Sequence, residues 1–280
     1  MTTAVSATVS ALPEAVSELP GAVSSWPGAD AAPLRKATEL NARPSATYAD
    51  KLAATEALLR QAATDFTTPD GQVQVVQAHS LGAEDVVVAH ILQRLNLPIA
   101  AFVLETGALH AETLALLERT RQAQPERLRV YQPQAEAVVQ FVQRHGADAM
   151  YQSIELRKAC CGVRKMEPLA RALAGQRAWI TGLRREQSGA RADVPAIEPD
   201  RSGDVERTKF NPLADWTWGD VWHYIATHGV DYNPLHDRFF PSIGCAPCTR
   251  AISLGEDFRA GRWWWEDEAA KECGLHAKKA

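Results

Sequence analysis

The sequence predicts an α/β fold in which a mainly parallel sheet is covered by helices. Short apolar runs rich in β-formers alternate along the chain with segments of helical periodicity. The runs are mostly apolar, which is typical of strands buried on both faces of a parallel sheet. Because strands that alternate with helices pair through crossover connections, we expect helices on both faces of that sheet.

Each predicted strand is a short apolar run, and each predicted helix repeats apolar residues every three or four positions. The first elements are a helix over 50–63 that Asp50 can cap, a strand over 72–78 (QVQVVQA), a helix over 84–95 with Val87, Ile91 and Leu95 on one face, a strand over 98–104 (PIAAFVL) and a helix over 110–121. A strand over 128–132, a helix over 135–144, a long helix over 154–173 and a strand over 178–183 (AWITGL) follow.

After Leu183 the chain is rich in loop-forming residues. One helix is predicted over 218–227, because Thr217 followed three residues later by Asp220 resembles a capping box. Residues 1–48 are rich in Ala, Ser and Pro and predict a flexible extension, since they cannot bury enough apolar surface to offset the entropy of ordering. We therefore expect the folded domain at 49–255 and a mobile C-terminal tail at 256–280.

Composition excludes several classes of protein. Hydrophobic residues make up 46% and charged residues 23% of the 280 residues, as in ordinary globular proteins. Lys plus Arg is 30 and Asp plus Glu is 34, which argues against a general nucleic-acid binder. No apolar run is long enough to predict a membrane helix. The first residues carry Glu14 and Glu18 and no basic start, so we expect no signal peptide and a cytoplasmic location.

The five cysteines divide into an adjacent pair, a CxxC pair and one near the end. An odd and sparse set is not a closed disulfide framework, which indicates a reducing compartment. A CxxC pair places two thiolates within reach of one metal centre. Adjacent cysteines on a helix point about 100° apart, so their sulfurs suit an iron–sulfur cluster better than a single zinc ion. Buried structural thiols are the alternative for Cys160, Cys161, Cys245 and Cys248.

Polar motifs follow three of the predicted strands and should meet at one edge of the sheet. The segment 79–85 (HSLGAED) suits a phosphate at a helix N-terminus, although an ordinary strand–helix turn is the alternative. The segment 105–110 (ETGALH) is either a ligand loop or a capped turn. The segment 181–188 (TGLRREQS), with Arg191 after it, suits a dianion or is a solvated charged loop.

Two further features could carry chemistry. Lys165 lies one helical turn after Cys161, where it could face an anionic substrate or simply be solvated. Cys273 lies in a polar tail beside Lys271 and His276, which could lower the pKa of its thiol, and it is otherwise an inert exposed thiol. The Trp run at 263–265 is interpreted mainly as packing anchors.

These motifs resemble those of the adenosine 5′-phosphosulfate (APS) and phosphoadenosine phosphosulfate (PAPS) reductase family, most closely its assimilatory APS reductases. The resemblance covers residues 50–280 and is carried by CCGVRK at 160–165, TGLRREQSGAR at 181–191, the stretch 209–222, GCAPCT at 244–249 and KECGLH at 271–276. It implies a fold like that of the adenine nucleotide α-hydrolases and ATP pyrophosphatases, with the nucleotide at the sheet edge. The loop at 80–85 departs from the SGGxDS of the pyrophosphatases, so ATP cleavage is not expected.

The resemblance also implies roles for individual residues. Ser80 and Gly82 correspond to the phosphate loop, and Glu105, Thr106 and Gly107 to a motif that lines the nucleotide site. Lys165, Arg259, Arg262 and His276 correspond to residues near the phosphosulfate and the nucleophile, and Arg184 and Arg185 belong to the matched strand-end motif. Cys160, Cys161, Cys245 and Cys248 correspond to the ligands of a [4Fe–4S] cluster, and Cys273 to the nucleophile.

The activity implied by this resemblance is reduction of APS to sulfite and AMP, in sulfate assimilation and cysteine biosynthesis. It implies an S-sulfocysteine intermediate on Cys273 and a thioredoxin or glutaredoxin-like dithiol as electron donor. It leaves the oligomeric state open. A PAPS reductase, an ATP-dependent RNA-thiolating enzyme and a zinc-stabilised nucleotide-binding module are the alternatives.

Overall fold

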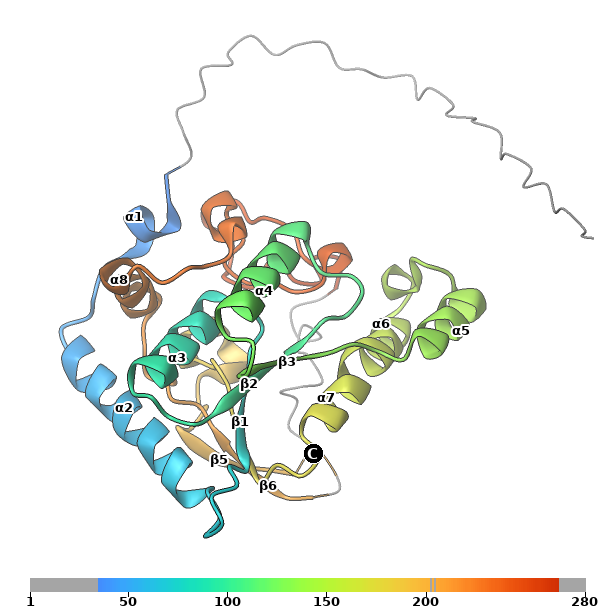
Figure 1. Ribbon diagram of the computed structural model, residues 1–280. Helices are drawn as coiled ribbons and strands as arrows, with labels where there is room; N and C mark the ends of the chain where they lie inside the picture. Colours follow the sequence, from blue (N-terminus) through green and yellow to red (C-terminus); the bar gives the residue numbers. More distant parts are fainter. Residues whose placement is uncertain (1–34, 202, 204, 267–280) are drawn as a thin grey trace, which may run out of the picture. The chain divides into compact units, whose positions relative to one another are not determined.

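The protein is described by a computed structural model in which residues 35–201, 203 and 205–266 are placed (Figure 1). A six-stranded sheet has the order β3-β2-β1-β4-β6-β5. Its strands are β1 (Val75–Ala78), β2 (Ala100–Leu104), β3 (Leu128–Tyr131), β4 (Ala178–Ile180), β5 (Ile197–Asp200) and β6 (Arg207–Phe210). Every neighbouring pair is parallel except β5 and β6. The predicted α/β class with a mainly parallel sheet is confirmed.

Helices cover both faces of the sheet (Figure 1). They are α1 (Ala37–Asn41), α2 (Tyr48–Asp65), α3 (Ala83–Arg94), α4 (Ala111–Ala123), α5 (Ala135–His145), α6 (Ile154–Cys161), α7 (Glu167–Ala172) and α8 (Trp218–His228). Within the described residues, none is long and apolar enough to cross a membrane.

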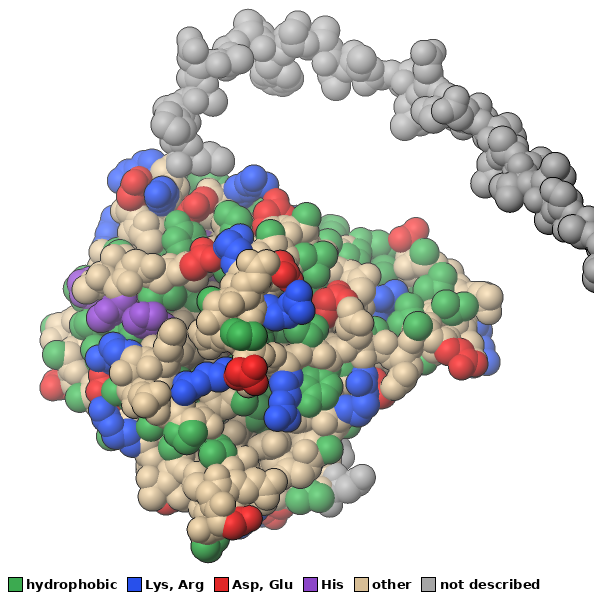
Figure 2. Space-filling view, viewed as in Figure 1, with side chains coloured by type: hydrophobic (Ala, Val, Ile, Leu, Met, Phe, Trp, Pro, Cys, Tyr) green, Lys and Arg blue, Asp and Glu red, His purple; other side chains and the backbone are tan. Residues whose placement is uncertain are grey.

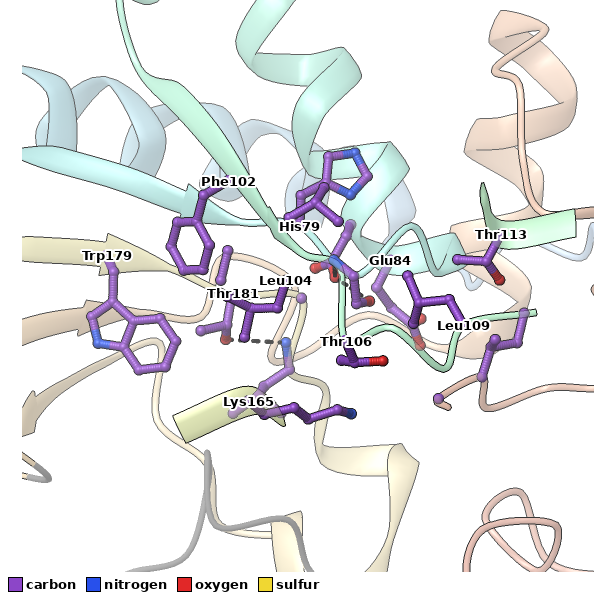
Figure 3. Close-up of a pocket in the computed structure, with 18 of the residues that line it drawn as sticks. His79, Glu84, Phe102, Leu104, Thr106, Leu109, Thr113, Lys165, Trp179 and Thr181 are labelled. Atoms are coloured by element: carbon purple, nitrogen blue, oxygen red, sulfur yellow. Dashed lines mark hydrogen bonds between the residues drawn. The ribbon is translucent and has the colours of Figure 1, made fainter. Parts of the chain in front are cut away.

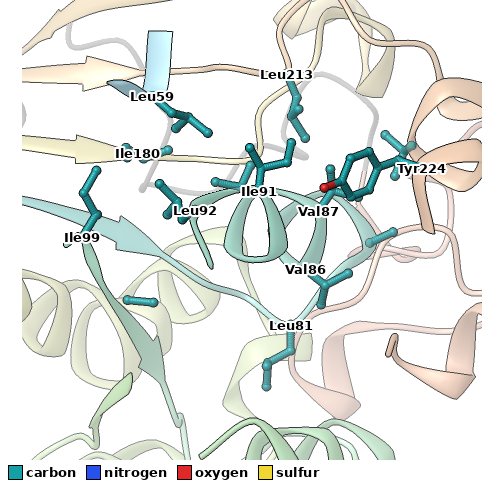
Figure 4. Packing of buried hydrophobic residues seen from close by; sticks show 14 of the residues in the cluster. Leu59, Leu81, Val86, Val87, Ile91, Leu92, Ile99, Ile180, Leu213 and Tyr224 are labelled. Carbon is teal, nitrogen blue, oxygen red and sulfur yellow. The ribbon is translucent and has the colours of Figure 1, made fainter. Parts of the chain in front are cut away.

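Alternate residues of each central strand enter two separate hydrophobic clusters. On β4, Ala178 and Ile180 face the larger cluster, which also contains residues of α2, α3, α4 and α8 (Figure 4). Trp179 faces the smaller cluster with Leu169 of α7. Because both faces of the central strands are buried, their sequences are mostly apolar; the exception on β1 is Gln77, whose side-chain amide donates to the Asp85 carbonyl at 2.8 Å.

Three features differ from the predicted elements. Strands β5 and β6 lie in the region that was predicted to be loops, because IEPD and RTKF carry charges and a proline. Pro199 is tolerated because β5 is an edge strand. The ammonium of Lys209 is paired with a carboxylate oxygen of Glu198 at 2.9 Å. The single helix predicted over 154–173 is interrupted by a π-helical turn at Gly162–Met166, directly after the cysteine pair. Finally, α2 begins at Tyr48 and Asp50 is not its N-cap.

The packed part of the chain also begins before residue 49, where we had placed the start of the domain. Ala37 is 1% exposed, and its N–H donates to the Asp237 carboxylate at 2.7 Å. The Ser45 N–H donates to the Asp220 carboxylate at 2.6 Å. Residues 35–47 are therefore attached to the folded unit through polar contacts with residues more than 150 positions away, which no local sequence pattern reports.

Asp220 connects this N-terminal segment with α8. Its carboxylate accepts the N–H of Thr217, and the Thr217 hydroxyl accepts the N–H of Asp220, which confirms the predicted capping box. The carboxylate also pairs with the Lys51 ammonium at 2.9 Å. Burial opposes ionisation of Asp220, but hydrogen bonds from Lys51, Ser45 and Thr217 outweigh it and hold its pKa at about 2.

Asp220→Asn is expected to lower the free energy of unfolding by about 1–2 kcal/mol at pH 7. The folded pKa lies below the ordinary value of 3.8, so the contribution is present above pH 3.8 and is lost as pH falls toward 2. Urea unfolding curves should therefore show the gap between wild type and variant closing below pH 4. The control is Asp231→Asn, whose partner Arg119 is exposed, and a gap that stays constant with pH would contradict the prediction.

Candidate active site

A pocket of about 190 Å³ opens at the carboxyl ends of the central strands. The strand order reverses between β1 and β4, because the chain passes from β1 to β2 and β3 on one side and returns to β4 and β6 on the other. Parallel sheets bind ligands at such a reversal. Figure 3 shows Phe102 and Trp179 at one end of the pocket and Leu109 and Thr113 at the other, with Lys165 between them. The pocket therefore has an apolar end, against which a flat ring could pack, and polar side chains in its middle.

The loop after β1 is a rigid turn. The backbone N–H and the hydroxyl of Ser80 both donate to the Asp85 carboxylate, at 2.7 and 2.5 Å. Leu81 has a positive φ of 64° and donates its N–H to the His79 ring at 3.0 Å. The Gly82 N–H reaches the Ser80 hydroxyl at 3.3 Å. The N–H groups that we expected to bind phosphate therefore have side-chain partners within the loop. Ser80 lines the pocket, whereas Gly82 does not.

Burial shifts the pKa values of two side chains at the base of this loop, Asp85 and His79. It raises the pKa of Asp85 to about 6, against the opposing hydrogen bonds from Ser80. It lowers the pKa of His79 to about 4, so the ring is neutral at pH 7. The loop presents a neutral imidazole and a carboxylate that titrates close to neutrality. Neither side chain was predicted as a site residue, although both lie within the motif at 79–85.

Gly182, after β4, lies against this loop. A Cβ atom at this position would be 2.4 Å from an Asp85 carboxylate oxygen and 2.8 Å from the Cβ of Glu84. Only glycine permits this approach, so Gly182 sets the width of the crevice between β1 and β4.

Gly182→Ala is expected to weaken nucleotide binding by at least about 10-fold, because the clash displaces Asp85 and with it the loop at Ser80. Equilibrium binding of AMP or APS to the purified protein measures this. Gly189→Ala is the matched control in the same segment, since nothing lies within 4 Å of its added Cβ. Equal affinity of the two variants would contradict the assigned role of Gly182.

The two predicted arginines of the next motif lie outside the pocket lining. Arg184 is fully buried, and its guanidinium pairs with the Glu84 carboxylate at 2.9 Å. Arg185 pairs with Asp215 and donates to the Val194 carbonyl at 2.9 Å. In this structure both hold loops together, and the direct anion contacts expected of them stay a prediction.

Gln187 and Arg191 of the same motif line the pocket instead. The Gln187 amide donates to the Glu84 carboxylate at 3.0 Å, and Arg191 donates to the Gln187 carbonyl oxygen at 2.6 Å. Arg191 was visible in the sequence as the last cation of the motif. Arg191 lines the pocket and Arg184 does not, because of the direction in which the loop points each side chain. No local sequence pattern predicts that direction.

The loop after β2 lies between the pocket at the sheet edge and the cysteines. Thr106 is buried and lines the pocket, and its hydroxyl lies 3.3 Å from the Cys245 sulfur. Gly107 has a φ of 68° and donates its N–H to the Glu105 carboxylate at 2.7 Å. Glu105 and Gly107 shape the loop without lining the pocket. Of the three predicted residues, Thr106 is the one that contacts both sites.

A second cavity, of about 200 Å³, is lined by all four predicted cysteine ligands, Cys160, Cys161, Cys245 and Cys248. The first two end α6, and the other two flank a short turn at Ala246–Cys248. The Ala246 N–H donates to the Ala108 carbonyl at 2.7 Å, which fastens the CxxC segment to the loop after β2. Within the described part of the chain, no group of three or more His, Cys, Asp or Glu side chains is placed to hold a metal ion as it stands.

The donor set nevertheless fits a multinuclear metal centre. Burial raises the pKa of Cys248 to about 12, and the neighbouring Cys245 and Cys161 add to the shift. Burial also opposes ionisation of Cys245, but Lys165 and Thr106 outweigh it and lower its pKa. Four convergent thiols can all ionise only when a cationic centre compensates them. The cavity is also larger than one metal ion needs.

Lys165 lines both cavities. It belongs to the π-helical turn that follows Cys161, and such turns are frequent at functional sites. The neighbouring Arg164 donates to the Thr106 carbonyl at 2.8 Å, which fixes the turn against the loop after β2. The interruption of the helix thus places one ammonium between the pocket at the sheet edge and the cysteines.

Arg262 and Arg259 are buried, and neither lines either of the two cavities. A Cβ on Gly244 would be 2.5 Å from the Arg262 guanidinium, so this arginine stacks against the segment that carries Cys245. Both guanidinium groups also lie over the Trp263 ring, at 4.8 Å for Arg262 and 5.9 Å for Arg259. Trp263 is 1% exposed, as expected of a packing anchor.

The predicted tail divides into two parts. Residues 256–266 are described and include the buried Arg259, Arg262 and Trp263. Cys273 and His276 lie outside the described residues. The mobility predicted for 256–280 therefore concerns a segment whose first part is packed against the domain.

The surface charge agrees with a localised anion site. In Figure 2, Lys and Arg side chains are interspersed with Asp and Glu over the visible face. Mixed charge of this kind gives no extended positive field. Among the described residues, Lys165 and Arg191 are the cations that line the pocket.

Comparison with known proteins supplies independent information. The family model described as the phosphoadenosine phosphosulfate reductase domain matches residues 74–251. The adenosine 5′-phosphosulfate reductase of Allochromatium vinosum is 55% identical over 73% of this chain and 79% of its own. That of Burkholderia cepacia is 53% identical over 71% of this chain and 79% of its own.

Solved structures show the same fold. A phosphoadenylyl-sulfate reductase from Candida auris, solved as a phosphate complex, superposes with a TM-score of 0.57 at 26% identity, over 69% of this chain and 88% of its own. The FMN adenylyltransferase of Candida glabrata has a TM-score of 0.50 at 11% identity, over 85% of this chain and 81% of its own, which shows the shared fold alone.

Proposed function

Because this chain belongs to the phosphoadenosine phosphosulfate reductase family, we propose that it reduces adenosine 5′-phosphosulfate to sulfite and AMP. One observation carries the proposal: Lys165 borders both the pocket at the sheet edge and the cavity lined by four cysteines. A phosphosulfate bound in the pocket would then extend toward this ammonium. We place the reaction in sulfate assimilation and cysteine biosynthesis, in the cytoplasm.

The nucleotide would bind with its adenine near Phe102 and Trp179 and its phosphosulfate toward Lys165. The cations at Lys165, Arg259 and Arg262 would stabilise negative charge that develops on the leaving phosphate. Ser80, Thr106 and Arg191 line the same pocket and are available for polar contacts. Arg184 would act indirectly, by holding Glu84 and the loop beside the pocket.

Cys273 would supply the nucleophile. Its thiolate attacks the sulfate sulfur, the bond from that sulfur to the phosphate oxygen breaks, and AMP leaves with S-sulfocysteine formed on Cys273. His276 and Lys271, close in sequence, favour the thiolate. A dithiol protein of the thioredoxin or glutaredoxin kind then attacks the Cys273 sulfur. Sulfite leaves, and the second thiol of the partner resolves the mixed disulfide and regenerates Cys273.

Cys160, Cys161, Cys245 and Cys248 would hold a [4Fe–4S] cluster. When bound, the cluster ties the two cysteine segments together and supplies a fixed local charge beside Lys165. The chain's own contribution is to orient that lysine through the π-helical turn and the Arg164 contact. Thr106 supports the arrangement by its contact with Cys245.

PAPS reduction is the second candidate. It uses the same chemistry on a nucleotide with an additional 3′-phosphate, and the solved relative from Candida auris is a phosphoadenylyl-sulfate reductase. The presence of all four cysteines favours APS in the family pattern, and the relatives at 53% and 55% identity are APS reductases. The RNA-thiolating alternative would require an intact SGGxDS loop, which this sequence lacks.

The experiment is anaerobic purification followed by assay of iron and labile sulfide, and of sulfite release with reduced thioredoxin. We expect about four irons and four sulfides per chain, and faster sulfite release from APS than from PAPS. Colourless, zinc-loaded protein would overturn the cluster assignment. A higher kcat/KM for PAPS would overturn the substrate assignment.

A further inference from the structure

A buried ion pair joins the cysteine helix to the C-terminal segment. Arg157 of α6 donates from Nε and Nη2 to the two carboxylate oxygens of Glu266, both at 2.8 Å. The two side chains are 1% and 3% exposed. This two-pronged, water-excluded geometry is the strong and directional form of an Arg–carboxylate contact.

Arg157 makes two further contacts that fix its position. Its guanidinium carbon lies 4.5 Å from the centre of the Trp263 ring, and Trp263 is 1% exposed. Arg157 also lines the cysteine cavity, three and four residues before Cys160 and Cys161 on the same helix. A single guanidinium therefore contacts the C-terminal segment on one side and borders the cysteine cavity on the other.

Glu266 is the last residue that the structure describes, and Cys273 follows it by seven residues. A fully extended stretch of that length spans at most about 25 Å. The place where Glu266 is held therefore limits the volume in which the Cys273 sulfur can be found. Neither Arg157 nor Glu266 lines the nucleotide pocket, so neither is expected to contact the nucleotide.

We propose that Arg157 and Glu266 are positioning residues that fasten the root of the C-terminal tail to the cysteine helix and so direct Cys273 toward the phosphosulfate. This inference rests on the proposed role of Cys273. It assigns to the ion pair a part in the first chemical step rather than in nucleotide binding. It also makes the delivery of the nucleophile depend on the position of α6, the helix that carries Cys160 and Cys161.

The test is Glu266→Gln, which keeps the shape of the side chain and removes its charge. At saturating APS, the rate of S-sulfocysteine formation on Cys273, measured by mass spectrometry in a single turnover, is expected to fall at least about 10-fold. The KM for APS and the iron content should stay within about 2-fold of wild type. Arg157→Lys, which retains a charge but not the two-pronged contact, should give an intermediate rate.

A double variant separates positioning from simple stability. Arg157→Met with Glu266→Met leaves no buried charge without its partner and should restore the melting temperature. The proposal expects the single-turnover rate to stay low, whereas recovery of the rate together with stability would overturn it. Glu256→Gln is the control in the same segment, because its partner Arg250 is 38% exposed and the pair lies at the surface.

The outcomes also distinguish this inference from the function on which it depends. Activity in Cys273→Ser would overturn the proposed nucleophile. An inactive Cys273→Ser together with a wild-type single-turnover rate in Glu266→Gln would overturn only the positioning role.

Discussion

Replacement of Cys273 by serine is expected to stop sulfite release from APS, with turnover lowered by at least about 10⁴-fold. The physical reason is the state of the attacking atom. A cysteine near neutral pH supplies a thiolate, whereas a serine hydroxyl remains protonated and is a far weaker nucleophile toward sulfur. The measurement is sulfite production with reduced thioredoxin at saturating APS.

The same variant should retain its brown colour, its iron and its affinity for AMP. In the proposed assignment those properties depend on Cys160, Cys161, Cys245 and Cys248 and on the pocket at the sheet edge, which are separate from Cys273 in sequence. Cys161→Ser provides the reciprocal comparison, because it should lose iron while Cys273 is still present. Sulfite release by Cys273→Ser at the wild-type rate would contradict the mechanism.

The core of the fold was predictable because its signals are local. A strand buried on both faces is mostly apolar, as β1, β2 and β4 are, with the buried Gln77 of β1 as the exception. The capping box at Thr217 and Asp220 is likewise a short-range pattern, and it stands where it was predicted. Strands β5 and β6 were not predicted, because they are stabilised by contacts with neighbouring strands and not by a local apolar pattern. The Lys209 ammonium is buried only because Glu198, on the neighbouring strand, compensates it.

The site could be predicted in position but not in detail. Strand-end motifs meet at one sheet edge for topological reasons, and Ser80 and Thr106 of two such motifs line the pocket there. Lys165 was predicted instead from its place one helical turn after Cys161 and from the family resemblance, and it lines the same pocket. Which arginine of TGLRREQSGAR faces the pocket depends on the buried carboxylate of Glu84, which pairs with Arg184 and leaves Arg191 in the lining. The attachment of Arg157 to Glu266 joins residues 109 positions apart, and no spacing rule reports it.

Lys165→Met is expected to lower kcat/KM for APS by about 10²–10³-fold while iron content is retained. The lysine borders both the pocket and the cysteine cavity, and in the proposed mechanism its ammonium stabilises the negative charge that develops on the departing phosphate. Removal of an interaction that strengthens in the transition state lowers kcat and kcat/KM alike, and a smaller change is expected in the affinity for AMP.

Two comparisons make this prediction specific. Lys165→Arg keeps the positive charge and should recover part of the activity, because the field survives although the shape of the group differs. Lys158→Met removes an exposed lysine from the same helical stretch and should leave kcat/KM unchanged. A loss of kcat/KM in Lys165→Met but not in Lys158→Met would show that the position of the Lys165 ammonium matters, and not only the net charge near the cysteines. If Lys165→Met lost its iron, as Cys161→Ser is expected to, Lys165 would stabilise the cysteine site and would not act on the leaving phosphate. If it kept both iron and full activity, the lysine would have no part in the reaction, and stabilisation of the leaving phosphate would pass to Arg259 and Arg262.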